Sequence, residues 1–202
     1  MTEDTRLIVD VLTGFLGAGK TSLVRRLAEA GALADTAVLV NEYADLPVDQ
    51  TLMEISGIKA ATFANGCLCC ATDDDLRSSL LQLLEKRATG EIPDFRRILI
   101  ETSGIADPGP MLATLVVDPM LCPRIRLGRV VTLVDLCHAS TTLAEQPEAV
   151  AQIVAADVVL FTKADLAEEH EIAVAASVVN TINPIALSFD LRRQDSFNPF
   201  II

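Results

Sequence analysis

The sequence has little basic charge and no long hydrophobic run. Sixteen lysines and arginines stand against 28 aspartates and glutamates, which gives a formal net charge of −12. A nucleic-acid-binding protein needs a basic surface to neutralise phosphates, so this class is disfavoured. No apolar run approaches the roughly 18–20 residues of a membrane-spanning helix, and residues 1–10 lack a signal-peptide pattern. We expect a cytoplasmic protein that binds neither nucleic acid nor membrane.

The cysteines are few and unevenly placed. There are five, and three of them, Cys67, Cys69 and Cys70, lie within four residues, whereas Cys122 and Cys137 stand apart. An odd number clustered in this way argues against the disulfide framework of a secreted protein. In a reducing compartment, such a cluster indicates metal binding or thiol chemistry.

Apolar runs alternate with helical spacing along the chain. A chain of 202 residues is long enough for one α/β domain and short for two. Alternation of strands and helices predicts an α/β fold with a mostly parallel sheet and helices on both faces. Strands are expected at residues 6–12, 36–40, 60–64, 97–100, 129–134 and 158–162, and helices at 20–30, 73–84, 148–155 and 168–180. We expect one domain over residues 1–182, followed by a tail or truncated linker at 183–202.

A phosphate-binding loop follows the first predicted strand. The pattern G-x-x-x-x-G-K-[ST] is matched without a gap, and the next position is Ser22. Its residues are Gly14, Phe15, Leu16, Gly17, Ala18, Gly19, Lys20 and Thr21. Glycines let backbone N–H groups turn toward a phosphate, and the following helix presents its positive end to the same anion. Lys20 is expected to reach the β- and γ-phosphates, and the Thr21 hydroxyl to bind Mg²⁺. The alternative is a glycine-rich turn that binds nothing.

A second motif predicts which base is bound. Thr162, Lys163 and Asp165 follow the last predicted strand and fit the [NT]-K-x-D pattern of guanine sites. A carboxylate at Asp165 can accept hydrogen bonds from both N1–H and the exocyclic amine of guanine, which adenine cannot supply. The alternative is an ordinary strand end, but the position beyond a phosphate loop favours guanine.

An acidic residue and a glycine follow the strand at 97–100. The segment reads Glu101-Thr102-Ser103-Gly104. Glu101 can hold the Mg²⁺ shell or orient the attacking water, and the Gly104 N–H can touch the γ-phosphate and register its loss. Lys20, Glu101 and Gly104 are therefore the candidate catalytic residues. A solvated carboxylate at a strand end is the plain alternative.

The cysteine cluster forms a C-x-C-C motif. Thiolates at Cys67, Cys69 and Cys70 suit Zn²⁺ or Cu⁺. Three ligands from one loop leave one coordination position of the metal open, which suits transfer of the metal to another protein. Cys67 and Cys70 also form C-x-x-C, so a thiol–disulfide switch is an alternative, and inert buried cysteines are another.

Together these motifs resemble the CobW-type GTPases, relatives of UreG and HypB that are regarded as metallochaperones. The matching segments are LTGFLGAGKTSL, NEY, NGCLCC, IETSGIADPGPML, VVTLVD, ADVVLFTKADL and INP. The resemblance implies a P-loop NTPase fold of the G-domain kind. It also implies binding of GTP and Mg²⁺, slow GTP hydrolysis, and a divalent metal at the cysteines, most often zinc, with cobalt in some branches.

The chain departs from this family pattern in two places. Ala44 and Pro47 replace glycines in the first switch, and Pro47 stiffens that loop. Asp45 stands where the family has a glutamate and is a candidate additional metal ligand. The usual second domain after the INP segment does not follow here.

Three hypotheses for the function remain. The first is a GTP-hydrolysing metal chaperone that transfers zinc or another divalent ion to a client metalloprotein, with a nucleotide- or metal-dependent homodimer as one arrangement. The second is a small-molecule P-loop kinase or ATPase. The third is a truncated module that holds nucleotide and metal without turnover.

Overall fold

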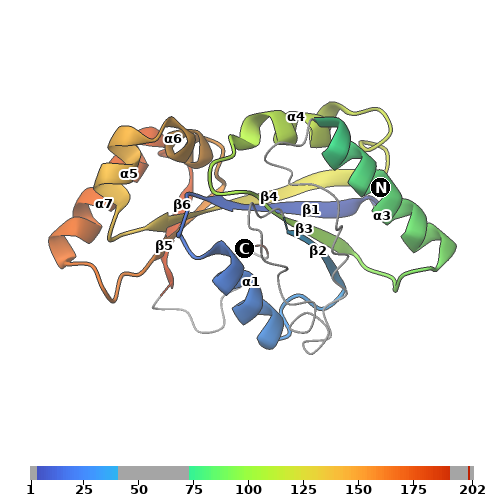
Figure 1. The fold of residues 1–202 in the computed structure, drawn as a ribbon, viewed down its shortest axis with the longest axis horizontal. Coiled ribbons are helices and arrows are strands. Elements are labelled where there is room, and N and C mark those ends of the chain that lie inside the picture. The colour runs from blue at the N-terminus through green and yellow to red at the C-terminus, as the bar shows by residue number, and fades with distance from the viewer. Residues whose placement is uncertain (1–3, 41–72, 192–199, 201–202) are drawn as a thin grey trace.

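The computed structural model describes residues 4–40, 73–191 and 200. Within these residues, strands form one parallel sheet in the order β2-β3-β1-β4-β5-β6 (Figure 1). The strands are β1 Leu7–Gly14, β2 Thr36–Val40, β3 Arg97–Glu101, β4 Ile125–Asp135, β5 Val158–Thr162 and β6 Leu187–Asp190. The predicted α/β fold with a parallel sheet is confirmed.

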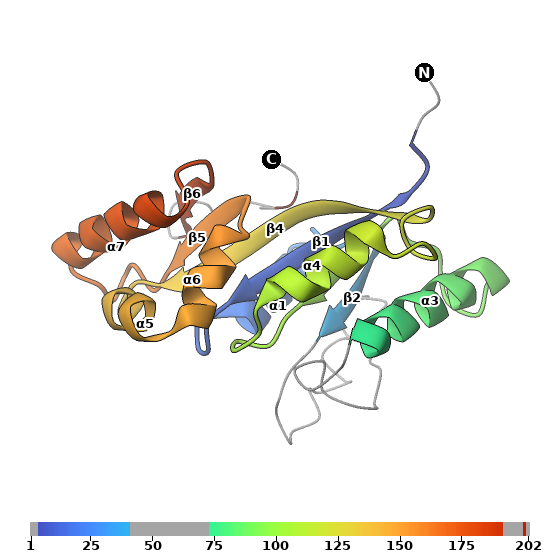
Figure 2. The same cartoon turned by 90° about the horizontal axis from the view of Figure 1, so that it is seen from above.

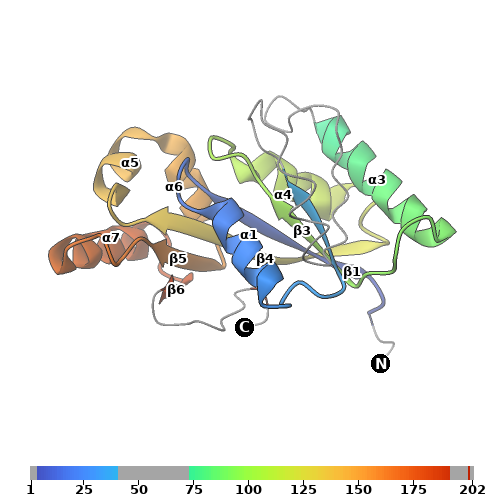
Figure 3. The same ribbon diagram turned by 60° about the horizontal axis from the view of Figure 1, so that its bottom comes forward.

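Helices cover both faces of this sheet. Helix α1 lies across one face, and α4 and α6 lie on the other (Figures 1 to 3). The helices are α1 Lys20–Glu29, α3 Asp73–Thr89, α4 Pro108–Val117, α5 Ala139–Glu145, α6 Pro147–Val154 and α7 Glu169–Ile182. The alternation of side chains along β1 explains the two layers. Val9 and Val11 pack in one core cluster with Leu115 of α4, whereas Leu12 packs in another with Leu23 of α1.

The carboxyl ends of the central strands meet at one edge of the sheet. The parallel register pairs Leu12 of β1 with Glu101 of β3, and Gly14 with Leu133 of β4. Ligands of open α/β sheets bind at this edge. The register therefore brings the segments after β1, β3, β4 and β5 together.

The structure corrects several predicted elements. The expected helix at residues 148–155 is α6, but a separate helix, α5, precedes it, and α4 was not predicted at all. Asp107 is the N-cap of α4, and its side chain accepts a 2.8 Å hydrogen bond from Gly109 N. Strand β4 begins at Ile125 rather than at residue 129. The prediction missed its first residues because Arg126 and Gly128 interrupt the apolar run. The strand expected at 60–64 lies outside the described residues.

Parts of the segment at 183–202 pack against the sheet. Strand β6 pairs with β5 along Leu187–Asp190. Phe200 is 5 % exposed and packs in the core cluster that contains α1, while its carbonyl accepts a 3.1 Å hydrogen bond from Arg97 Nη1. None of the helices in the described part of the chain is long and apolar enough to cross a membrane.

Candidate functional site

The phosphate loop joins the end of β1 to the start of α1. Gly14 ends the strand with a φ of 140°, and a Cβ there would lie 2.5 Å from the backbone oxygen of Leu133. Only glycine fits this close approach of two backbones. The sequence therefore folds into a tight turn that faces the carboxyl edge of the sheet.

The Lys20 side chain and the N-terminus of α1 both lie at the phosphate loop. Lys20 Nζ donates hydrogen bonds to Gly14 O at 2.8 Å and to Phe15 O at 3.3 Å, so the ammonium group lies across the loop. No side chain caps the N-terminus of α1 at Gly19. A helix end of this kind directs backbone N–H groups at an anion.

A hydroxyl and a carboxylate meet beside the loop. Thr21 Oγ1 donates a 2.6 Å hydrogen bond to Glu101 Oε1, and Glu101 is only 3 % exposed at the end of β3. Hydroxyl and carboxylate oxygens are hard ligands of the kind that Mg²⁺ prefers. The donor set therefore fits the magnesium ion that the sequence predicts at Thr21 and Glu101.

These groups line a cavity of about 300 Å³. Its lining residues come from the phosphate loop, the start of α1 and the segment after β3: Leu16, Gly17, Gly19, Lys20, Thr21, Ser22, Glu101, Thr102, Ser103 and Gly104. The three candidate catalytic residues thus share one cavity. Gly104 lies directly against the loop, because a Cβ there would be 2.7 Å from the Leu16 nitrogen.

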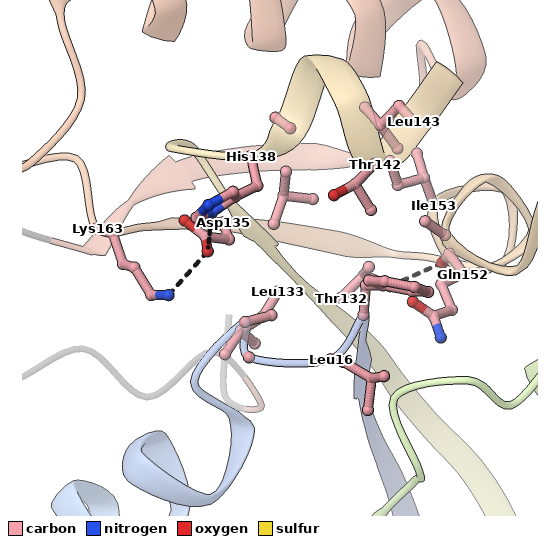
Figure 4. Close-up of a pocket in the computed structure, with 16 residues that line it drawn as sticks. Leu16, Thr132, Leu133, Asp135, His138, Thr142, Leu143, Gln152, Ile153 and Lys163 are labelled. Atoms are coloured by element: carbon pink, nitrogen blue, oxygen red, sulfur yellow. Dashed lines mark hydrogen bonds and ion pairs between the residues drawn. The ribbon is translucent and has the colours of Figure 1, made fainter. Parts of the chain in front are cut away.

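The motif of the predicted guanine site lies at the end of β5. Thr162 Oγ1 donates a 2.9 Å hydrogen bond to Ala18 O, which ties β5 to the phosphate loop. Asp165 is exposed three residues further on. Lys163 adopts a φ of 56° and points toward the end of β4 (Figure 4). The structure therefore places the base motif beside the phosphate loop.

Asp135 holds the lysine of this motif. Its Oδ2 atom lies 2.8 Å from Lys163 Nζ and 3.0 Å from His138 Nδ1 (Figure 4). Burial raises the pKa of Asp135, but hydrogen bonds from Lys163, His138 and the Cys137 N–H outweigh it, so the pKa lies below its ordinary value. Asp135 was not among the predicted site residues, although its place at the end of a predicted strand offered a signal.

Gln152 of α6 also touches the site and was missed. Its side-chain Nε2 donates to Gly104 O at 3.1 Å and to Ala106 O at 3.0 Å, while the buried Oε1 has no hydrogen-bond partner among the residues that the structure describes. Gln152 lines a second cavity of about 330 Å³, which extends behind the phosphate loop to Asp135.

The predicted ligands of the transferred metal belong to a part of the chain that the structure does not describe. Cys67, Cys69, Cys70 and Asp45 lie outside the described residues. Within the part of the chain that the structure describes, no group of three or more His, Cys, Asp or Glu side chains is arranged to hold a metal. Burial raises the pKa of the Cys137 thiol, which disfavours the thiolate that a metal needs.

A parallel sheet whose first strand runs through a phosphate loop into a helix, with Thr21 against Glu101, defines a P-loop NTPase. The family model described as the CobW/HypB/UreG nucleotide-binding domain matches residues 8–189. The chain belongs to this family. The resemblance noted from the motifs is thereby confirmed.

Relatives and a solved structure agree with this placement. The chain is 39% identical over 165 residues to the zinc chaperone YjiA of Escherichia coli K12, covering 82% of this chain and 52% of that protein. It is 34% identical over 185 residues to zinc-regulated GTPase metalloprotein activator 1 of Schizosaccharomyces pombe, covering 88% and 44%. The crystal structure of Zn(II)-bound YjiA GTPase from E. coli superposes with a TM-score of 0.76 at 32% identity, covering 98% and 61%. The chain spans about half the length of these curated relatives.

Proposed function

We propose that this chain is the GTPase domain of a zinc chaperone that couples GTP hydrolysis to transfer of the metal to a client protein. The observation that carries the proposal is the Thr21–Glu101 hydrogen bond inside the phosphate cavity, in a chain whose relatives are named zinc chaperone and zinc-regulated GTPase metalloprotein activator. We propose that residues 1–182, the range expected from the sequence, form the main part of this domain, on which β6 and Phe200 also pack, in a cytoplasmic protein.

The phosphate cavity supports binding of a nucleoside triphosphate. Backbone N–H groups of the loop and the start of α1 would hold the β-phosphate, and Lys20 would exchange its two carbonyl partners for phosphate oxygens. Thr21 and Glu101 would hold Mg²⁺, which offsets the charge of the β- and γ-phosphates when bound. Ser22 lines the same cavity.

Hydrolysis needs a water in line with the γ-phosphate. Glu101, buried at the end of β3, would orient that water or the magnesium shell, and the Gly104 N–H would meet the terminal phosphate. Both roles are proposed because Glu101 and Gly104 line the phosphate cavity. Loss of the γ-phosphate would remove the partner of Gly104 and release its loop.

Guanine selection rests on Asp165 and Lys163. The exposed carboxylate of Asp165 would accept two N–H groups of the base, and the stem of Lys163, held by Asp135, would pack on its ring. The base would then lie close to Ala18, because Thr162 binds the loop at that point.

Metal handling is assigned to the cysteine motif. Cys67, Cys69 and Cys70 would bind zinc, with Asp45 as a further ligand and cobalt as an alternative cargo. The motif lies in the chain between β2 and α3, and α3 contacts α4, which follows the loop of Gly104. A movement of the Gly104 loop would therefore be transmitted through α4 to α3, which follows the cysteine motif in the chain. A homodimer that depends on nucleotide or metal is part of this proposal.

A nucleotide competition experiment separates this function from its alternative. Purified chain is loaded with a fluorescent GDP analogue in Mg²⁺ buffer and titrated with GTP and, separately, ATP, and phosphate release is followed. We expect GTP to displace the analogue at concentrations far below those of ATP, with slow release of phosphate. Displacement by ATP at equal concentration would favour a small-molecule kinase or ATPase. Binding of GTP without any phosphate release would favour a non-catalytic module.

A further inference from the structure

One amide side chain holds two peptide groups of the loop that follows β3. Gln152 is 1 % exposed on α6, and its Nε2 donates to both Gly104 O and Ala106 O. Gly104 lines the phosphate cavity from this loop. Both side-chain donors of Gln152 are thus used on a single loop beside the phosphates.

The loop is confined from the opposite side as well. A Cβ on Gly104 would lie 2.7 Å from the Leu16 nitrogen and 2.8 Å from the Leu16 Cα, so the glycine touches the phosphate loop itself. Gly104 is therefore held between the phosphate loop and α6. Helix α6 is fixed to the sheet at the same residue, since Thr132 Oγ1 of β4 donates a 2.7 Å hydrogen bond to the backbone oxygen of Gln152.

The other end of the amide is not used within the described structure. Gln152 Oε1 is buried without a hydrogen-bond partner, and the side chain borders the cavity behind the phosphate loop (Figure 4). A leucine would fill a similar volume without an unpaired buried acceptor. The hydrogen bonds that the structure gives this side chain are those that its nitrogen donates to the loop.

We propose that Gln152 is a positioning residue that keeps the Gly104 loop at the edge of the phosphate cavity, ready for the terminal phosphate of a nucleoside triphosphate. The inference rests on the proposed nucleotide-binding function. It adds that the preference for triphosphate over diphosphate depends on a side chain of α6 that is not among the described lining residues of the phosphate cavity. A loop held in place before binding loses less conformational entropy when the γ-phosphate arrives.

The test compares the full chain with Gln152→Leu by calorimetric titration of GDP and a non-hydrolysable GTP analogue in Mg²⁺ buffer. Loss of two hydrogen bonds is expected to lower the ratio of analogue affinity to GDP affinity about tenfold, with GDP affinity changed less than about twofold. Because the chemical step is slow, KM for GTP is expected to rise in parallel with the loss of analogue affinity, and single-turnover hydrolysis at saturating GTP is expected to slow about tenfold. An unchanged affinity ratio and hydrolysis rate would overturn the inference.

Two further variants separate an effect of the amide on nucleotide binding from a general loss of stability. In Gln152→Glu the ionised carboxylate only accepts hydrogen bonds, whereas the protonated form can donate one. Its affinity ratio is therefore expected to recover in part between about pH 8 and pH 6, since burial raises the pKa of a carboxyl group. Thr132→Val removes the hydrogen bond to the backbone of Gln152 and leaves the amide in place. It is expected to lower Tm with the affinity ratio unchanged.

These variants also separate the inference from the proposed function. If Thr132→Val changes the ratio as much as Gln152→Leu, the position of α6 rather than the amide is responsible, and the inference is wrong. If Gln152→Glu shows no pH-dependent recovery while Gln152→Leu matches wild type, the inference is also wrong. A wild-type chain that binds neither nucleotide would overturn the proposed function itself.

Discussion

The Thr21 hydroxyl donates a 2.6 Å hydrogen bond to Glu101 Oε1, although the two residues are 80 positions apart in the sequence. Thr21 lies in the first turn of the helix after the phosphate loop, and Glu101 ends the neighbouring strand β3. The parallel register between β1 and β3 brings them together, because it aligns Leu12 with Glu101. Two oxygen ligands for a hard cation therefore follow from sheet topology.

The first prediction concerns this pair. Thr21→Ala removes the hydroxyl and is expected to lower the Mg²⁺-dependent gain in affinity for a GTP analogue about tenfold, because one metal ligand is lost. Affinity is measured by titration with and without EDTA. Thr21→Ser keeps the hydroxyl and should behave like wild type. An equal Mg²⁺ dependence in Thr21→Ala and wild type would contradict the magnesium assignment.

The second prediction concerns the base. Asp165→Asn replaces a carboxylate that accepts two N–H groups with an amide that donates as well, so GDP affinity should fall about a hundredfold. Xanthosine diphosphate, which carries a carbonyl at the amine position, should bind the variant better than wild type. Competition against a fluorescent nucleotide measures both. Asp94→Asn, on a largely exposed side chain, serves as the control and should change neither affinity. Retained GDP binding in Asp165→Asn would show that the base binds elsewhere.

The third prediction concerns the residue that holds Lys163. Asp135→Asn removes the negative charge from the 2.8 Å ion pair and is expected to weaken GDP binding about fivefold. His138→Ala removes the other partner of the same carboxylate oxygen and should change GDP affinity less than about twofold, since the His138 side chain is largely exposed. Equal effects of the two variants would count against a specific role of the Lys163 pair.

The pH dependence of this pair has a definite sign. The pKa of Asp135 lies below its ordinary value, because hydrogen bonds from Lys163 and His138 outweigh the effect of burial. A lowered carboxyl pKa gives an interaction that is present above the ordinary pKa and is lost only as pH falls through the folded value. GDP affinity should therefore show no loss from this group between about pH 8 and pH 5. A loss centred near pH 5 that disappears in Asp135→Asn would contradict this.

The fourth prediction concerns stability. Phe200 packs in the core cluster against α1, and its carbonyl accepts a hydrogen bond from Arg97. Phe200→Ala is expected to lower the free energy of unfolding by about 3 kcal/mol, because it leaves a cavity in that cluster. Ile185→Ala, at a position that is 89 % exposed, should change it by less than about 0.5 kcal/mol. Denaturant unfolding measures both, and equal effects would show that Phe200 does not belong to the core.

Local patterns were enough to predict the centre of the fold. The strands at 36–40 and 158–162 coincide with β2 and β5, because short apolar runs of this kind are buried on both faces of a parallel sheet. The phosphate-loop residues and Glu101 were predicted as site residues from the spacing of their motifs. Their meeting in one cavity follows from the sheet register.

Features that depend on tertiary contacts could not be predicted. Strand β6 has half-exposed residues and no apolar run, and its pairing with β5 defines it. Gln152 reads in sequence as a polar residue of an amphipathic helix, yet its side chain is buried against Gly104 and Ala106. Asp135 ends a predicted strand, but its contact with Lys163, 28 residues away, depends on the pairing of β4 with β5.

The central claim is that nucleotide state controls metal binding. The most direct measurement is a zinc titration of the reduced protein against a competing chelator, first with GDP and then with a non-hydrolysable GTP analogue. We predict tighter zinc binding with the analogue and loss of the difference in Cys69→Ser, and by linkage zinc should raise analogue affinity by the same factor. Equal zinc affinity in the two nucleotide states would contradict the account.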